Sequence, residues 1–296
     1  MKPREGKEGW QSGASEQLAP YHVMKQNAGR QCEDISPAYS RFAQMYDWVM
    51  HDVDYEMWAD YILGLIRPAR VNGKDLLDLA CGTGNVSFAM ARRGYRVTGL
   101  DLSPEMLDVA RKKGQDLVLA PVPLPDGTVP TIKPVEFVQG DMRDFHLGRQ
   151  FHVITCLYDS INYLRTEDDL ARTLMCARAH LKRGGIFIFD VNTEYQLARS
   201  HNKRAMMFEK GDQIVLFWQD RWIQKTKIWQ VRLTGFVKEG DLYRRFREMH
   251  EERAYSAAEV TSCLDKAGFR RVTVYEAYAF QPSGPQSPRL YFVARA

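Results

Sequence analysis

The sequence predicts an α/β protein: a mostly parallel β-sheet with helices on both faces, and an antiparallel β meander inserted late in the chain. Between residues 75 and 190, short apolar runs alternate with amphipathic segments, which is the order of a parallel sheet connected by helices. From about 205 to 254 the pattern changes to long alternating runs, separated by polar residues at 210–212, 225–227 and 239–241. Such runs are typical of antiparallel strands.

The composition is that of an ordinary globular protein. The chain has 296 residues, of which 45% are hydrophobic and 26% charged, so we expect one α/β domain with additions. No apolar run approaches the roughly 20 residues that cross a bilayer, and the basic start of the chain lacks the apolar core of a secretory signal. Five cysteines without CxxC spacing favour free thiols, a cytoplasmic location and no metal site.

Basic residues are scattered, and the net charge is only +4. The short cluster Arg244, Arg245 and Arg247 is interpreted as the solvated face of a strand. Nucleic acid is therefore not indicated as a partner. The sequence leaves both a monomer and a homodimer open.

The chain begins with a polar extension and two helices. Residues 1–35 show no sustained period, and we expect them to be a flexible extension. Residues 38–49 carry apolar side chains at three- and four-residue spacing, which predicts a first helix. A second helix is expected at 55–66, ended by Arg67 and Pro68.

The alternating part is expected to supply five parallel strands. Each is a short apolar run, and we place them at residues 75–80, 95–100, 135–139, 151–157 and 186–190. Helices are expected between them at residues 85–93, from Ser103-Pro104 onward, and at 166–181, where a Thr-x-x-Asp box opens the helix and Gly184-Gly185 stop it. A proline-rich surface loop is expected at 114–134.

The last part of the chain returns to the large sheet. Ser256-x-x-Glu259 predicts a helix that ends at Gly268, and two final strands follow near 271–276 and 290–294. Three parts result: an extension at 1–35, a ligand-binding domain at 36–204 with 255–296, and an antiparallel subdomain at 205–254. Ligands of such sheets lie at the carboxyl ends of the strands.

A glycine loop is the strongest chemical signal. The run from Asp78 to Gly84 (DLACGTG) joins the first strand to a helix, where glycines permit close approach of a ligand. Ser87 stands where a dinucleotide fingerprint needs glycine or alanine. Asp78 suits an ammonium group and repels a diphosphate. Asp101 ends the second strand, where a carboxylate accepts bonds from ribose hydroxyls. A ligand with ammonium, carboxylate and ribose is therefore favoured.

Four segments follow in a characteristic order: LLDLACGTGNVSFAMARRGYRVTGLDLSPEMLDVAR, FVQGDMRDF, FHVITCLYDSINYL and LKRGGIFIFDVN. In them the chain resembles the class I S-adenosylmethionine-dependent methyltransferases, over about residues 35–296. It is most similar to a bacterial small-molecule branch with a YDSINYL-type segment, a meander and an RRF…H…RAYS stretch, and also to sugar-amine N-methyltransferases. The resemblance implies a Rossmann-like, seven-stranded methyltransferase sheet and S-adenosylmethionine as cofactor.

The resemblance also implies roles for residues on the methionine side of the cofactor. Gly82 and Gly84 would face the methionine part, together with Ala80. Cys156 would place its backbone near the amino group, and Tyr46 would close over the cofactor from the N-terminal helices. Sugar-amine relatives have an arginine eight residues after this tyrosine, where this chain has Asp54; for Tyr46 a plain core aromatic is the alternative.

On the nucleoside side, Asp101 would bind the ribose, with Leu102 beside the adenine. Asp141 would accept the exocyclic amine of the adenine, and Met142 would hold the ring. Met106 completes the expected set, although packing within its own helix is the simpler interpretation. Asp101 and Asp141 could instead be turn or capping residues.

No shared catalytic residue is expected, because the methyl group of a sulfonium is electrophilic before the enzyme acts. The protein must align the acceptor and exclude water, and a base is needed only if the acceptor has to lose a proton. Tyr158, Asp159 and His250 are candidates. For His250, a surface histidine is the simpler interpretation, and for Trp58 a core aromatic.

The leading hypothesis is a methyltransferase that acts on a small-molecule acceptor. The alternatives are a catalytically silent cofactor-binding regulatory or assembly protein, and a nicotinamide dehydrogenase, against which Ser87 and Asp78 argue. We further hypothesise that the meander forms a wall of the acceptor site; a dimerisation ribbon is the alternative.

Overall fold

The computed structural model describes residues 35–117, 119–200 and 206–296. The extension predicted at 1–35 lies, except for its last residue, outside them.

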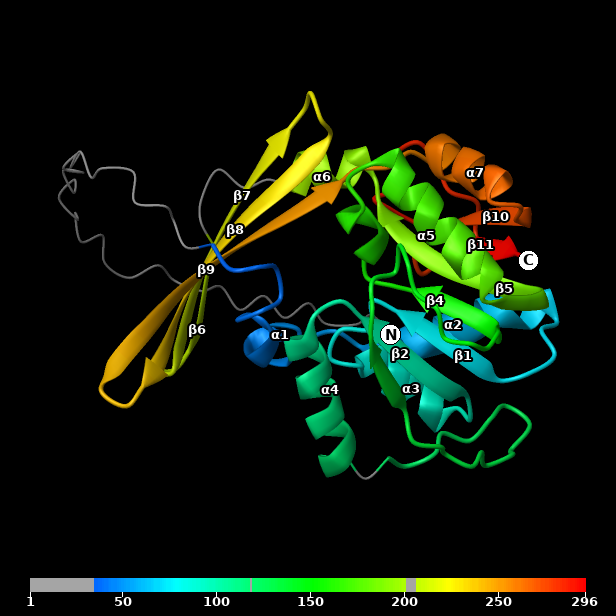
Figure 1. Cartoon of the computed structure of the whole chain (residues 1–296), viewed down its shortest axis with the longest axis horizontal. Helices are drawn as coiled ribbons and strands as arrows, with labels where there is room; N and C mark the ends of the chain where they lie inside the picture. Colours follow the sequence, from blue (N-terminus) through cyan, green and yellow to red (C-terminus); the bar gives the residue numbers. More distant parts are fainter. Residues whose placement is uncertain (1–34, 118, 201–205) are drawn as a thin grey trace, which may run out of the picture. The chain divides into compact units, whose positions relative to one another are not determined.

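Seven strands form one mixed sheet in the order β10-β11-β5-β4-β1-β2-β3 (Figure 1). The strands are β1 (Asp75–Leu79), β2 (Arg96–Asp101), β3 (Glu136–Gln139), β4 (Phe151–Cys156), β5 (Leu181–Asn192), β10 (Arg270–Glu276) and β11 (Arg289–Arg295). The first five are parallel, whereas β11 runs antiparallel to β5 and β10 antiparallel to β11. The predicted seven-stranded Rossmann-like sheet is confirmed.

Helices cover both faces of this sheet because its central strands are apolar on both sides. Leu76 and Ile186 face a core formed with α2 (Tyr55–Ala69) and α3 (Asn85–Arg92). Leu77 and Phe187, one position further along each strand, face a core formed with α5 (Glu167–Ala179) and α7 (Ala257–Lys266). The two-residue period of a strand therefore divides the core into two layers.

Hydrogen bonds at helix starts agree with the predicted capping residues. Ser103 caps α4 (Pro104–Asp116), and Thr166 caps α5 by accepting from the Asp169 amide. Ser256 and Glu259 form a complete capping box at α7. These side chains satisfy amides that the helix itself leaves unpaired.

Several predicted boundaries were wrong. The first helix, α1 (Ala43–Val49), begins later than residue 38, and α2 continues through Pro68. The glycines at 184 and 185 do not stop α5, which ends at Ala179, but lie inside β5 where its pairing with β4 shifts register. A Cβ at Gly185 would lie 2.9 Å from the backbone oxygen of His152, so this irregularity requires glycine. The short helices η1 (Ser160–Tyr163) and α6 (Glu194–Ser200) were not predicted.

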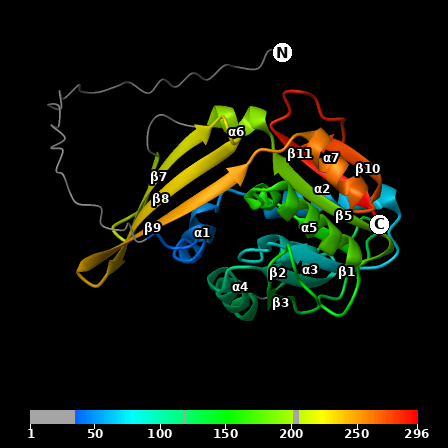
Figure 2. The same cartoon turned by 45° about the horizontal axis from the view of Figure 1, so that its top comes forward.

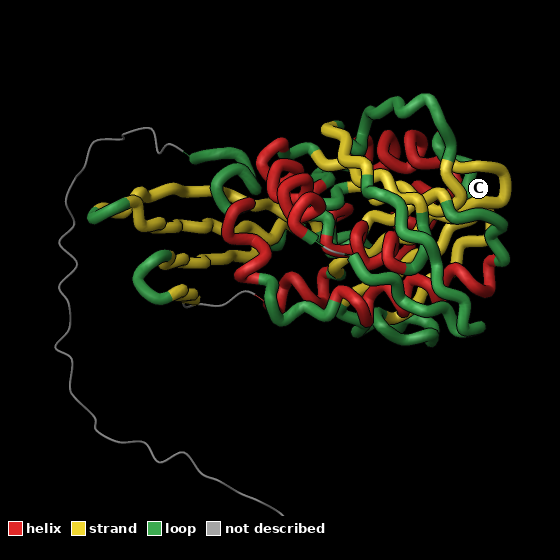
Figure 3. Tube along the Cα trace, turned by 90° about the horizontal axis from the view of Figure 1, so that it is seen from below, coloured by secondary structure: helices red, strands yellow, loops and turns green. Residues whose placement is uncertain are grey.

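A second sheet is formed by the inserted segment, and the predicted antiparallel meander is confirmed. Its strands, in the order β6-β7-β8-β9, are β6 (Met206–Lys210), β7 (Ile214–Ile223), β8 (Ile228–Glu239) and β9 (Leu242–Arg253). Figures 1 and 2 show it beside the large sheet, and Figure 3 shows its hairpins extending beyond the helices. Phe42 and Met45 of the N-terminal segment pack on its Leu216, Leu233 and Phe246.

Candidate active site

A cavity of about 560 Å³ lies at the carboxyl ends of the parallel strands. Its lining comes mainly from the ends of β1 and β2, from the residues that follow β1 to β4, and from the N-terminal segment with α2. The predicted cofactor residues that line it are Tyr46, Asp78, Ala80, Gly82, Asp101, Leu102, Met106, Asp141 and Met142. This is the edge at which sheets of this kind bind ligands.

Two predicted cofactor residues are not part of the lining. Gly84 caps α3, and a Cβ there would lie 2.8 Å from the Phe137 ring, so close packing explains the glycine. The side chain of Cys156 is fully buried at the end of β4. Only its backbone is therefore available for the predicted contact.

The loop after β1 is shaped by left-handed backbone conformations. Ala80 and Gly82 have φ angles of 52° and 56°, a region that residues with a Cβ seldom adopt. The Cys81 amide donates to the Leu100 carbonyl at 3.1 Å, and the Gly82 amide donates to Asp101 at 2.7 Å. The loop is thereby fastened to the end of β2.

Asp101 organises the corner between β1, β2 and α4. One carboxylate oxygen accepts from the Gly82 amide, and the other accepts from the Ser103 amide at 2.9 Å. Burial raises the pKa of Asp101, although the Ser103 and Gly82 amides act in the opposite direction. The carboxylate also lines the cavity, so its remaining lone pairs are available to ligand hydroxyls.

Asp78 is almost fully buried at the end of β1. Its carboxylate accepts from the Ser87 hydroxyl at 2.6 Å and from the Thr155 hydroxyl at 2.8 Å. Ser87, which breaks the dinucleotide pattern, thus serves to hold Asp78. Burial raises the pKa of Asp78 to about 6 despite these two bonds.

The segment after β3 carries an ion-pair chain. Arg143 binds both carboxylate oxygens of Asp141, at 2.6 to 3.0 Å, and reaches Asp169 of α5 at 3.1 Å. The side-chain bond from Arg143 lowers the pKa of Asp141. All three side chains line the cavity. Asp141 is therefore a fixed, ionised acceptor at this end.

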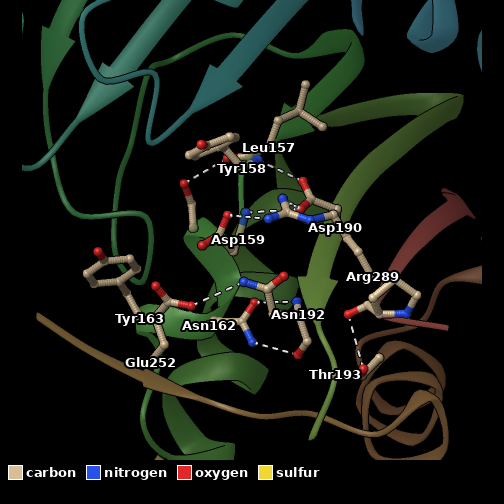
Figure 4. Close-up of polar contacts among 12 residues, drawn as sticks. Leu157, Tyr158, Asp159, Asn162, Tyr163, Asp190, Asn192, Thr193, Glu252 and Arg289 are labelled. Atoms are coloured by element: carbon tan, nitrogen blue, oxygen red, sulfur yellow. Dashed lines mark hydrogen bonds and ion pairs between the residues drawn. The ribbon is translucent and has the colours of Figure 1, made fainter. Parts of the chain in front are cut away.

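The turn after β4 has a strained backbone and is held by the buried carboxylate of Asp190. Tyr158 and Asp159 have positive φ angles of 61° and 54°, which is costly for residues other than glycine. Their amides donate to the Asp190 carboxylate at 2.7 and 3.0 Å. Arg289 pairs with Asp190 at 2.5 Å and with Asp159 at 2.9 Å (Figure 4). This arrangement fixes the Tyr158 ring at the cavity, with its centroid 5.0 Å from the centroid of the Trp58 ring.

The three candidate catalytic residues lie in different places. Tyr158 lines the cavity, whereas Asp159 and His250 do not. The interpretation of His250 as a surface histidine was wrong: it is 4% exposed, because it lies on the inward face of β9. Trp58 is a buried core aromatic, as interpreted, and also lines the cavity. Asp54 accepts from the Met57 amide as the cap of α2.

Sequence reasoning missed Asp190, Arg289 and Glu248. Asp190 lies near the carboxyl end of an apolar strand, as Asp101 does, and this position could have marked it. No pattern in the sequence marks Arg289, which is 99 residues from its partner Asp190. Glu248 is fully buried, but it lies in a run of charged residues that resembles a solvated strand.

In the described part of the chain, no group of three or more His, Cys, Asp or Glu side chains is placed to hold a metal ion. No helix in that part is long and apolar enough to cross a membrane.

The fold and the cavity define a nucleoside-binding α/β domain of the methyltransferase type. Residues 76–185 match the family model described as a methyltransferase domain. The chain is 32% identical to the putative methyltransferase YqeM of Bacillus subtilis, over 87% of this chain and 96% of the relative. The crystal structure of an S-adenosylmethionine-dependent methyltransferase from Clostridium acetobutylicum is similar, with 29% identity and a TM-score of 0.71 over 86% of this chain and 97% of that one.

About half of the chain also matches an N,N-dimethyltransferase whose name gives an amino sugar. The chain is 33% identical to the dTDP-3-amino-3,4,6-trideoxy-alpha-D-glucopyranose N,N-dimethyltransferase of Streptomyces venezuelae, over 50% of this chain and 56% of the relative. The protein belongs to the class I S-adenosylmethionine-dependent methyltransferase family. It is an enzyme that uses S-adenosylmethionine.

Proposed function

We propose that the enzyme transfers the methyl group to a small-molecule acceptor inside this cavity. The observation that carries the proposal is the position of Asp78, Asp101 and Asp141: each lies at or just beyond the carboxyl end of one of three neighbouring strands, and all three line one cavity. The similarity to a sugar-amine N,N-dimethyltransferase supports a small acceptor and makes an amine the first candidate for its nucleophile.

The residues present fit the cofactor. Asp101 would accept the ribose hydroxyls, since it faces the cavity while its amide bonds hold it in place. Asp78 would stabilise the ammonium group by charge, with Ala80 and Gly82 beside the methionine part. Asp141, Leu102, Met106 and Met142 would enclose the adenine. Tyr46 would cover the methionine end.

Methyl transfer requires that the acceptor be aligned with the methyl group and that water be excluded, more than it requires an acid or a base. When bound, S-adenosylmethionine supplies an electrophilic methyl carbon. The Tyr158 and Trp58 rings form an apolar boundary that excludes water from the acceptor nucleophile. Burial raises the pKa of Tyr158, so its hydroxyl stays neutral near pH 7 and can orient an acceptor without removing a proton. A neutral amine attacks directly and needs no base.

A panel of acceptors tests the proposal. Production of S-adenosylhomocysteine is measured with amino-sugar nucleotides, free amino sugars and simple amines, and with matched hydroxyl compounds. We expect turnover with at least one amine and none with its hydroxyl analogue. Tight cofactor binding without turnover on any small molecule would favour the silent cofactor-binding protein instead.

A further inference from the structure

The smaller sheet, formed by β6 to β9, carries one fully buried carboxylate, that of Glu248, near the cavity. Among the described residues, none from β6 to β9 belongs to the lining of this cavity, and the hypothesis that the sheet forms a wall of the acceptor site stays a prediction. Glu248 of β9 is nevertheless fully buried against the segment that precedes α1. A buried charge is tolerated only when hydrogen bonds or ion pairs satisfy it.

Both oxygens of Glu248 bind that N-terminal segment. Oε1 accepts from the Arg41 amide at 2.6 Å, from the Phe42 amide at 2.9 Å and from the Ser40 hydroxyl at 3.2 Å. Oε2 accepts from the Tyr39 amide at 2.9 Å. One side chain therefore fixes the backbone of residues 39–42, which is otherwise an irregular stretch before a short helix.

The fixed segment is part of the cavity. Residues 37–40 belong to its lining. The Ser36 amide donates to the Arg247 carbonyl at 2.9 Å, which fastens the start of the segment to β9. The Tyr39 carbonyl accepts from the Ser103 hydroxyl at 3.0 Å, beside the Asp101 corner. The segment thus connects β9 to the edge of the cavity where the ribose is proposed to bind.

The Tyr39 side chain closes a ring of polar contacts. Its hydroxyl lies 2.7 Å from the Tyr163 hydroxyl, which lies 3.1 Å from Nδ1 of His250. Nε2 of His250 is 3.3 Å from Oε2 of Glu248, which also binds the Tyr39 amide. Both tyrosine rings line the cavity. Glu248 therefore holds Tyr39 through its backbone amide, whereas Nε2 of His250 makes no hydrogen bond to any described residue.

Glu248 stays ionised at neutral pH. Burial alone would raise its pKa, but the neighbouring His250 and the bonds from the Phe42 and Arg41 amides outweigh burial and lower the pKa. Charge-assisted bonds of this kind are the stronger ones. A glutamine at this position has only one acceptor oxygen, so its NH2 group would face either the Tyr39 amide or the Arg41 and Phe42 amides, and it could not replace the carboxylate.

We propose that Glu248 is a positioning residue for cofactor binding: it clamps residues 39–42 over the cavity and so makes the smaller sheet a part of the cofactor site. The proposal rests on the placement of the cofactor in this cavity. It gives the inserted sheet a function that does not require contact with either ligand.

The test compares Glu248→Gln with a matched control. Glu239→Gln removes a carboxylate from the same sheet, where Glu239 pairs with Arg244 at the surface. Affinity for S-adenosylhomocysteine is measured by calorimetry, amide hydrogen exchange is followed at Tyr39, Arg41 and Phe42, and thermal unfolding reports the fold. For Glu248→Gln we expect at least fivefold weaker binding and faster exchange confined to this segment. The control should match the wild type.

The outcomes separate the clamp from the site assignment. Faster exchange with unchanged affinity would show that the clamp is structural only and would overturn the proposal. Unchanged exchange would show that Glu248 does not hold the segment. If Glu248→Gln unfolds, Glu248→Asp keeps the charge but withdraws the carboxylate from the Tyr39, Arg41 and Phe42 amides, and unchanged affinity in that variant would overturn the proposal. A wild-type protein that fails to bind S-adenosylhomocysteine would refute the assignment of the cavity itself.

Discussion

Asp101 shows how one carboxylate can support both the fold and the ligand. Its two oxygens already bind the Gly82 and Ser103 amides, so the glycine loop and the start of α4 are held before any ligand arrives. Preorganisation of this kind lowers the ordering cost of binding. The sequence motif predicted a ribose acceptor here, but it could not show the additional bond to the loop.

Replacement of Asp101 tests this dual role. Asp101→Ala removes charge-assisted bonds worth roughly 1.5–3 kcal/mol each at most, and it releases the two amides. We expect at least tenfold weaker binding of S-adenosylhomocysteine by calorimetry. Asp108→Ala, on the exposed side of α4 where Asp108 pairs with Arg111, should bind normally. Equal affinity in both variants would mean that the ribose lies elsewhere.

Asp78 predicts a pH dependence of binding. Its pKa of about 6 lies above the ordinary 3.8, so the native state favours the protonated carboxyl, and this group stabilises the fold less as pH rises from about 4 to 6. A cationic ammonium favours the ionised form. Affinity for S-adenosylhomocysteine should therefore fall as pH drops below 6, by up to about tenfold per unit.

Calorimetry between pH 5 and 8 measures this dependence. Asp78→Asn cannot titrate, so its affinity should be low and nearly independent of pH over the same range. A wild-type profile as flat as that of the variant would contradict the proposed contact between Asp78 and the ammonium group.

At the level of elements, the turn after β4 joins parts of the chain that no local pattern connects. The sequence predicts β4, β5 and β11 from their apolar runs. It does not show that Asp190 of β5 and Arg289 of β11 meet beneath Tyr158 and Asp159. Long-range pairing decides this contact, whereas strand positions follow from local hydrophobicity. For the same reason the prediction that Gly184 and Gly185 stop α5 was wrong: both lie at the register shift inside β5.

Arg289→Ala should destabilise the protein strongly. The substitution leaves the fully buried Asp190 and the nearly buried Asp159 without their cation, and breaking a buried ion pair costs about 3–5 kcal/mol. Chemical denaturation should show this loss in the free energy of unfolding. Arg270→Ala, at the exposed start of β10, should change it little. A loss below about 1 kcal/mol for Arg289→Ala would contradict the role of this pair.

At the level of the whole molecule, the large sheet provides the proposed cofactor site, and the smaller sheet holds the N-terminal segment that lines the same cavity. The alternation of strands and helices predicted the first sheet, and the change of period predicted the second. The relation between the two sheets depends on Glu248 and on an N-terminal segment more than 200 residues away, which a single sequence does not reveal. The insertion is thus tied to the cavity by hydrogen bonds from its inner face.

Binding of small molecules to the wild-type protein tests the central claim most directly. Calorimetry is performed with S-adenosylmethionine, S-adenosylhomocysteine and NAD under identical conditions. The arrangement of Asp78, Ser87 and Asp101 predicts one site per chain for the first two compounds and binding of NAD weaker by at least a hundredfold. Tight binding of NAD with no response to S-adenosylmethionine or S-adenosylhomocysteine would contradict the account.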